Sequence, residues 1–271
     1  MKKIQWTSGL IVVTIALVFS SCTKEKQSTL DATSILDENI ASFAEKSTSE
    51  MEDAATLKSG GGNPCSPQDQ LPECAVYTED SESYPKNITI DFGDGCADPM
   101  GRVRSGIIHI NLTDDMLNEG AVRTVTFENY AVNDIEIEGI RTTTNTGLNE
   151  FSQPTFSRNI EMSIERPQGT FERTCNGNVA WVSGFDTPEC GDNVFTETGS
   201  GTLTRPNGVV MTHTITEALL IDRNCGYVID GIIEISGPNG EGNIDFGDGT
   251  CDDQAIVTRP NGDVETITLH H

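Results

Sequence analysis

Four short segments of one kind punctuate the chain, and they constrain its fold more than any other feature. Each reads x-Pro-[Asn/Gln]-Gly, where proline presets φ for the second position of a turn and glycine accepts a positive φ. The segments are Arg166-Pro167-Gln168-Gly169, Arg205-Pro206-Asn207-Gly208, Gly237-Pro238-Asn239-Gly240 and Arg259-Pro260-Asn261-Gly262. Each lies between two runs of strand-forming residues, so each predicts a hairpin loop.

The runs around these turns predict an all-β fold. They cover residues 103–112, 122–132, 135–144, 156–165, 194–203, 209–219, 227–235 and 264–269. Period-two alternation, for example Ile135 and Ile137 with Glu136 and Glu138, predicts one buried and one exposed face. No helical pattern separates consecutive runs, which argues against parallel βαβ units. We predict an antiparallel meander of roughly a dozen or more strands that closes into a sandwich or barrel.

The first 25 residues resemble a bacterial lipoprotein signal. Lys2 and Lys3 precede a short apolar run, residues 9–19, which ends at small residues directly before Cys22. The run is shorter than the roughly 20 residues that a bilayer span needs. We predict removal of residues 1–21, lipidation of Cys22 including a palmitate-type chain, and anchoring to the outer membrane, at the cell surface or the periplasmic face. An ordinary secretory signal is the alternative.

Residues 22–72 differ in composition from the rest of the chain. Apolar residues recur at irregular spacings of three to four between 30 and 58, which is compatible with one or two amphipathic helices. Asp31 and Ser34 are candidate caps, and the stretch 59–64 breaks any helix. We interpret 22–72 as a partly helical tether that precedes a β domain at 73–271. The alternative is a helix docked on that domain.

The charge of the chain limits the classes of partner. Its formal net charge is −25 at pH 7. A field of this sign repels phosphate backbones and anionic lipid headgroups, so we expect no nucleic-acid binding and no docking through basic patches. High negative charge is also a common means of keeping an exposed protein soluble.

The cysteines follow an internal duplication. Asp-Phe-Gly-Asp-Gly occurs at residues 91–95 and again at 245–249, each copy followed by a cysteine and preceded by a cysteine that opens a strand. Hairpin geometry places the two cysteines of each copy near one another, so we predict the disulfides Cys74–Cys96 and Cys225–Cys251. A third pair, Cys175–Cys190, flanks a possible turn at 183–184. Cys65 would remain single. The sequence contains no Cys-x-x-Cys, which disfavours zinc and iron–sulfur sites.

The duplicated motif also suggests a cation site. Carboxylates cluster on both copies, and calcium prefers several oxygen ligands on a tight loop. The candidate ligands are Asp91, Asp94, Asp98, Asp245, Asp248 and Asp252. The alternative is a glycine-rich turn whose aspartates cap backbone N–H groups. We predict no cofactor from the sequence, with calcium at these aspartates as the open alternative.

Nucleophile and metalloprotease motifs are absent from the sequence, and no catalytic residue is assigned. His109 and His213 lie in strand-like runs, where we expect exposed positions. Paired carboxylates of a glycoside hydrolase stay an open alternative, because carboxylates are abundant throughout the chain.

Several segments resemble a group of β-rich lipoproteins from Bacteroidetes-type bacteria. The resemblance spans roughly residues 73–269 and is carried by stretches 89–93, 101–108, 127–133 and 244–252. It implies a secreted β-rich fold and no particular activity. Together these features predict a lipid-anchored envelope protein with a non-enzymatic structural or binding β domain, whose protein or glycan partner stays open. The alternative is a cell-surface glycan hydrolase with paired carboxylates.

Overall fold

The structure is a computed structural model that describes residues 30–57, 70–187, 191–238 and 240–270. These residues form one β-sheet with a helix, α1, packed against it. Its elements are α1 (Ala32–Thr56), β1 (Val76–Glu79), β2 (Lys86–Asp91), β3 (Cys96–Ala97), β4 (Val103–Leu112), β5 (Val122–Val132), β6 (Ile135–Leu148), β7 (Pro154–Arg166), β8 (Gly169–Ser183), β9 (Val194–Thr204), β10 (Val210–Asp222), β11 (Asp230–Gly237), β12 (Gly240–Asp248), β13 (Gln254–Thr258) and β14 (Val264–Thr268).

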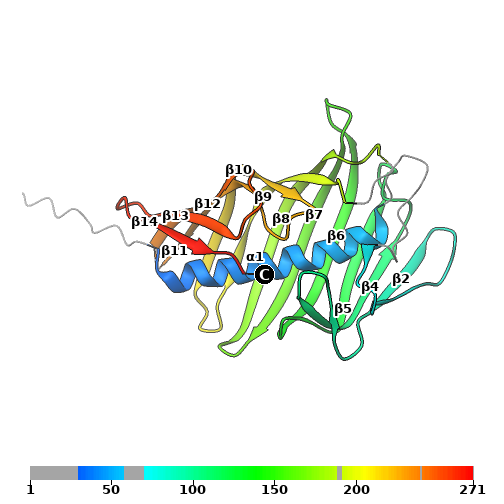
Figure 1. Cartoon of the computed structure of the whole chain (residues 1–271), viewed down its shortest axis with the longest axis horizontal. Coiled ribbons are helices and arrows are strands. Elements are labelled where there is room, and N and C mark those ends of the chain that lie inside the picture. Colours follow the sequence, from blue (N-terminus) through cyan, green and yellow to red (C-terminus); the bar gives the residue numbers. More distant parts are fainter. Residues whose placement is uncertain (1–29, 58–69, 188–190, 239, 271) are drawn as a thin grey trace, which may run out of the picture.

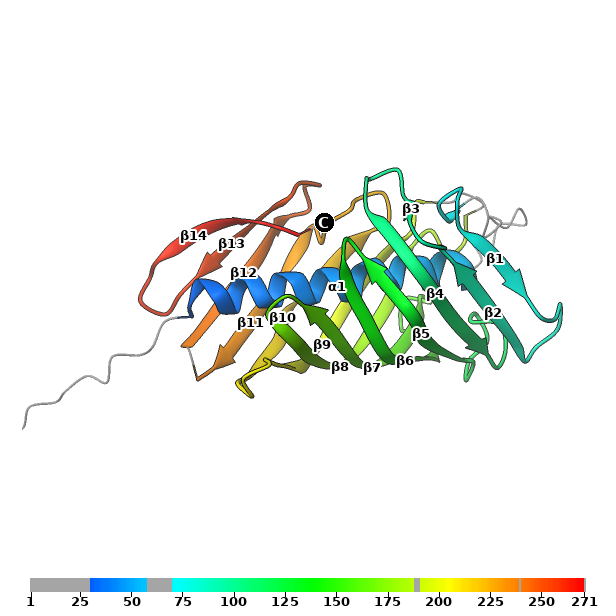
Figure 2. The same cartoon turned by 90° about the horizontal axis from the view of Figure 1, so that it is seen from below.

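The strands form a 14-stranded antiparallel meander, as predicted. The sheet order follows the chain from β1 to β14, with β3 as a side branch that pairs with β4. The predicted closure is not found: β1 and β14 end the sheet order, and no second sheet packs on the first among the described residues. Instead, the sheet curves around α1, which runs along the long axis of the molecule and crosses the strands (Figures 1 and 2).

Helix α1 is a single helix with the predicted start. Asp31 is its N-cap, and the Asp31 carboxylate accepts a hydrogen bond of 2.7 Å from the Ser34 N–H, which satisfies one of the orphan donors of the first turn. The helix ends where Leu57 adopts an extended conformation.

The interpretation of this region as a tether is wrong for the helical part. Most residues of α1 are buried, polar ones included, and Phe43, Ala44 and Met51 belong to the main hydrophobic cluster. The docked helix is the arrangement that the structure shows. The reason is chemical: carboxylates on α1 find arginine partners on the sheet, so a helix of modest apolarity can be buried.

The apolar side chains form two clusters along α1. The larger one extends from β2 to β10, and the smaller one joins Leu30 and Ile35 to residues of β10–β13 and to Leu269. Both clusters face the helix. The sheet is therefore filled from one side by α1, which takes the place that a second sheet occupies in a sandwich.

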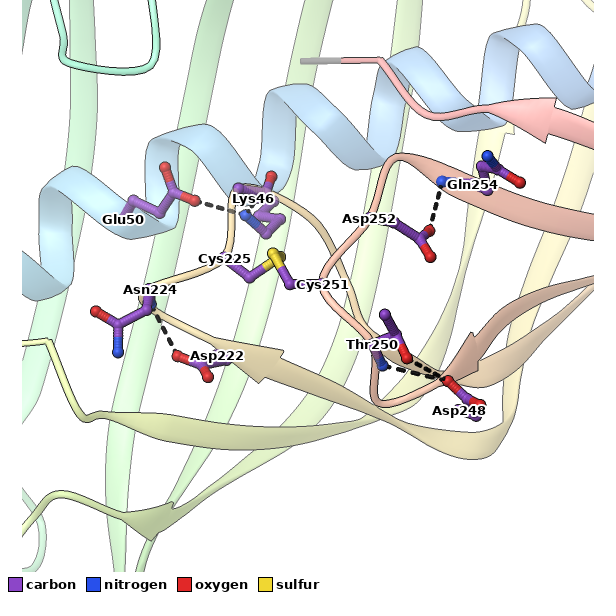
Figure 3. The surroundings of a disulfide bond; sticks show 11 residues. Lys46, Glu50, Asp222, Asn224, Cys225, Asp248, Thr250, Cys251, Asp252 and Gln254 are labelled. Atoms are coloured by element: carbon purple, nitrogen blue, oxygen red, sulfur yellow. Dashed lines mark hydrogen bonds and ion pairs between the residues drawn. A yellow bond between two sulfur atoms is a disulfide. The ribbon is translucent and has the colours of Figure 1, made fainter.

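Both disulfides of the duplicated motif are confirmed. Cys74 is bonded to Cys96, and Cys225 to Cys251, which joins the β10–β11 connection to the β12–β13 connection (Figure 3). The predicted Cys175–Cys190 pair is wrong for Cys175, which has a free, buried thiol. Strand β8 continues to Ser183 and its partner β9 begins only at Val194, so Cys175 lies opposite Gly201. Cys65 and Cys190 lie outside the described residues.

Candidate functional site

A row of buried arginines lines the concave face of the sheet. Consecutive strands β4 to β8 each contribute one, and the turn after β9 adds another. They are Arg104, Arg123, Arg141, Arg158, Arg173 and Arg205, and each is at most 9 % exposed. Each strand places its arginine on the same face as its buried apolar residues, because side chains alternate between the two faces. We call these six residues the arginine row.

Carboxylates of α1 face the arginine row. Glu38, Glu45 and Glu52 are spaced by seven residues, which brings them to one side of a helix. Arg173 donates to Glu38 at 2.9 Å and to Glu45 at 2.8 Å. The Arg141 Nε lies 3.0 Å from Glu52, which is itself fully buried.

The ion pairs continue toward both ends of the helix. Near its start, Arg205 donates to Asp37 at 2.7 Å. Near its end, Arg123 donates to Asp53 at 2.9 Å. The order of partners shows that α1 runs from the later strands toward the earlier ones, as Figure 1 also shows. The helix is thus held along its length by charge-assisted hydrogen bonds.

The arginines keep the helix carboxylates ionised in spite of burial. Burial by itself raises the pKa of Asp53, but the charges of Arg223, Arg123 and Arg158 outweigh it and lower this pKa to about 2. Burial likewise opposes ionisation of Glu45, and Arg173 with neighbouring arginines lowers its pKa below the usual range.

A cavity of about 60 Å³, measured as space open to the centres of water molecules, lies between the middle of α1 and strands β7–β12. It separates the two hydrophobic clusters: Val179 and Phe195 on one wall belong to the larger cluster, while Leu219, Ile233 and Phe246 belong to the smaller one. The polar side of the cavity is formed by the following residues: Ser42, Glu45, Lys46, Ser49, Arg158, Arg173, Cys175, Glu197, His213 and Arg223.

The pKa values of two carboxylates in this cavity, Glu197 and Glu45, are shifted in opposite directions. Burial raises the pKa of Glu197, and Arg158, whose Nη1 lies 3.3 Å from both Glu197 oxygens, offsets this only in part. The pKa of Glu45 is lowered by its arginine partners, as described above. Burial also raises the pKa of the Cys175 thiol well above its usual range, so this sulfur stays protonated and is a poor nucleophile at neutral pH.

The two strand histidines differ in environment. His109 is partly exposed, and its Nε2 lies 3.1 Å from the Glu128 carboxylate. The predicted exposure of His213 is wrong, because this residue is 2 % exposed and lines the cavity. Gly201 makes room for it: a Cβ at Gly201 would lie 2.5 Å from Cε1 of the His213 ring. Burial and the neighbouring Arg173 lower the pKa of His213, which keeps the ring neutral.

Five of the six predicted calcium ligands are engaged in turns or ion pairs. Asp91 and Asp245 accept from the N–H groups of Gly93 and Gly247, two residues further along each copy. Figure 3 shows the equivalent bonds from Thr250 to Asp248 and from Gln254 to Asp252.

The two remaining aspartates of the first copy differ in burial and in their partners. Asp98 is buried and binds Arg102 and Arg104, each at 2.7 Å, while Asp94 is exposed. Among the described residues, no group of three His, Cys, Asp or Glu side chains is arranged to hold a metal ion. Five of the six aspartates, all except Asp94, thus accept from a backbone N–H two residues further along, as the alternative interpretation of the motif predicts.

No protein-family model, curated protein or solved structure matches the chain. Among the described residues, no helix combines the length and apolarity that a membrane span requires.

Proposed function

We propose that the protein is a lipid-anchored envelope protein whose β domain binds a ligand and performs no chemistry. The observation that carries this proposal is the filling of the concave face by α1 and its ion pairs. At the cavity, Glu45 is held in an ion pair with Arg173, and the Cys175 thiol is buried in its protonated form. The small cavity beside the arginine row, which has one apolar wall, is the space that we assign to a ligand.

The position of α1 fits an anchor at Cys22, which lies outside the described residues. Nine residues separate Cys22 from the start of α1. At most about 3.3–3.6 Å per residue, they reach roughly 30 Å. Because α1 is part of the core and begins at one end of the long axis (Figure 1), an anchor at Cys22 would hold the domain close to the membrane by that end.

Glycan hydrolysis is the second candidate, favoured by Glu45 and Glu197. Two carboxylates in one cavity with pKa values pushed apart are the pattern of a glycosidase acid and its partner. The cavity argues against this role. Its volume of about 60 Å³ is well below the roughly 150 Å³ that admits one benzene ring in an engineered protein cavity. A pyranose ring is larger than benzene, so no sugar reaches these carboxylates while α1 is in place.

The anchor is tested by metabolic labelling with an alkyne analogue of palmitate, in cells that express the full chain. We expect label on the wild-type protein, no label on Cys22→Ser, and full label on the matched control Cys65→Ser. Acyl transfer to Cys22 needs its thiol, whereas Cys65 has no role in anchoring. Label on Cys22→Ser, or none on the wild type, contradicts the proposal.

A further inference from the structure

The cavity beside the arginine row contains buried hydrogen-bond donors that lack an acceptor. The Nδ1 of His213, the Nε of Arg158 and the Nε and Nη1 of Arg223 have no hydrogen-bond partner among the described residues. All three residues line this cavity. His213 and Arg158 are each more than nine-tenths buried. Since buried polar groups in proteins are nearly always paired, this set requires an explanation.

The contacts of His213 assign its tautomer. Its Nε2 lies 3.5 Å from Nη2 of Arg173, and a guanidinium can only donate. The neutral ring must therefore accept at Nε2, which places its hydrogen on Nδ1. The unpartnered Nδ1 is a donor, like the unpartnered arginine nitrogens. What these nitrogens lack is thus an acceptor.

The ion pairs set the charge that such an acceptor can carry. Arg158 faces Glu197, Arg173 faces Glu38 and Glu45, and Arg223 is bonded to Asp53. Every guanidinium at the cavity already has a carboxylate partner. An anionic ligand would be buried beside the ionised Glu45 carboxylate, whereas a neutral oxygen would satisfy a donor without this repulsion.

The remaining wall is aliphatic and aromatic. Strands β10 and β11 contribute Ile215, Leu219 and Ile233, and β12 contributes Phe246. We propose that the cavity binds an uncharged, mostly aliphatic molecule whose carbonyl oxygen accepts a hydrogen bond from Nδ1 of His213. This inference rests on the binding role proposed above and names the chemical class of the ligand.

The cavity volume sets the size of ligand that enters without rearrangement. A buried water needs roughly 10–15 Å³ of such space, so about 60 Å³ corresponds to about four to six waters or a short chain. A second, smaller cavity lies next to the first. The two share the lining residues Ser42, Lys46, Val228 and Phe246. Lys46 lines both cavities, and its Nζ donates to the Gly226 carbonyl at 2.9 Å. A longer ligand would extend past Lys46.

Three probes of nearly equal shape test the inference. They are 2-butanone, 2-methyl-1-butene, which replaces the carbonyl oxygen by a methylene, and propionate, which replaces a methyl by an anionic oxygen. Each is titrated into the purified full-length protein while the methyl resonances of Ile215, Leu219 and Ile233 are followed by NMR. We expect 2-butanone to bind at least tenfold more tightly than the alkene, equivalent to about 1.4 kcal/mol, and propionate not to bind.

A variant assigns the preference to the histidine. His213→Phe keeps a planar ring and removes the donor, so the ketone and the alkene should then bind within about twofold of one another. The comparison of probes on the wild-type protein does not depend on the folding of this variant. Equal binding of ketone and alkene, preference for propionate, or no binding of any probe up to its solubility overturns the inference. Acylation of Cys22 is measured separately, so failure of the anchor and failure of the cavity site are distinguishable.

Discussion

Replacing Arg141 with methionine is expected to lower the free energy of unfolding by about 3–5 kcal/mol, the range for breaking one side of a buried ion pair. Arg141 is fully buried and donates to the Glu45 carbonyl at 2.8 Å and to Ser49 at 2.7 Å, besides its contact with Glu52. Its loss leaves the fully buried Glu52 with a smaller share of positive charge. The measurement is the urea midpoint, with an unchanged slope as the sign that the folded state is retained.

Two further variants test whether the loss of stability in Arg141→Met comes from its buried ion pair. Arg141→Met combined with Glu52→Leu should cost less than the two single changes added together, because the unpaired charge is then absent. His109→Gln, which breaks an exposed pair with Glu128, should change stability by less than about 1 kcal/mol. A loss at Arg141 no larger than that of His109→Gln would show that the arginine row does not hold α1.

Acidification is the second perturbation with a large expected effect. The folded-state pKa of Asp53 is about 2, against an ordinary value of 3.8. A group whose pKa is lowered by folding contributes stability above its unfolded pKa and loses it as the pH falls through the folded value. Asp53 alone should therefore contribute roughly 2 kcal/mol at neutral pH, lost between about pH 4 and about pH 2. Glu45 and Glu50, whose pKa values are also lowered by arginine and lysine neighbours, add to this loss.

Urea unfolding at a series of pH values measures this acid sensitivity. Asp53→Asn is the matched control: it is less stable at neutral pH, and its stability should fall less steeply below about pH 4. Glu197 acts in the opposite direction, since burial raises its pKa, so the stability linked to its protonated form is lost as the pH rises. Unfolding free energies that stay constant from pH 7 down to about pH 3 would contradict the ionised pairs described for α1.

The alternation of apolar and polar residues and the turn motifs made much of the sheet predictable from the sequence. The bounds of β4 and β5 agree with the alternation in the sequence, and Ile135 and Ile137 are buried between exposed glutamates. The two disulfides followed from the hairpin turn of each duplicated motif. Such features depend on residues close in sequence, and turn residues set the register of neighbouring strands.

The docking of α1 and the cavity depend on contacts that local patterns do not encode. Arg123 alternates in phase with Val125, which places it on the buried face. An arginine at such a position is ordinarily interpreted as solvent-exposed, and its partner Asp53 lies 70 residues away. Periodicity showed which face Arg123 occupies and could not show what it meets there. The seven-residue spacing of Glu38, Glu45 and Glu52, together with one arginine per strand, was the available signal.

Amide hydrogen exchange tests most directly whether α1 is part of the core of this domain. We expect the amides of α1 between Ile40 and Ala54 to exchange as slowly as those of β6–β8, with the opening free energy of global unfolding. A helix that serves as a tether would exchange through local opening, well before the sheet. Slow, sheet-like exchange of α1 supports the arginine row as the element that holds the helix, and fast exchange of α1 beside a protected sheet would contradict it.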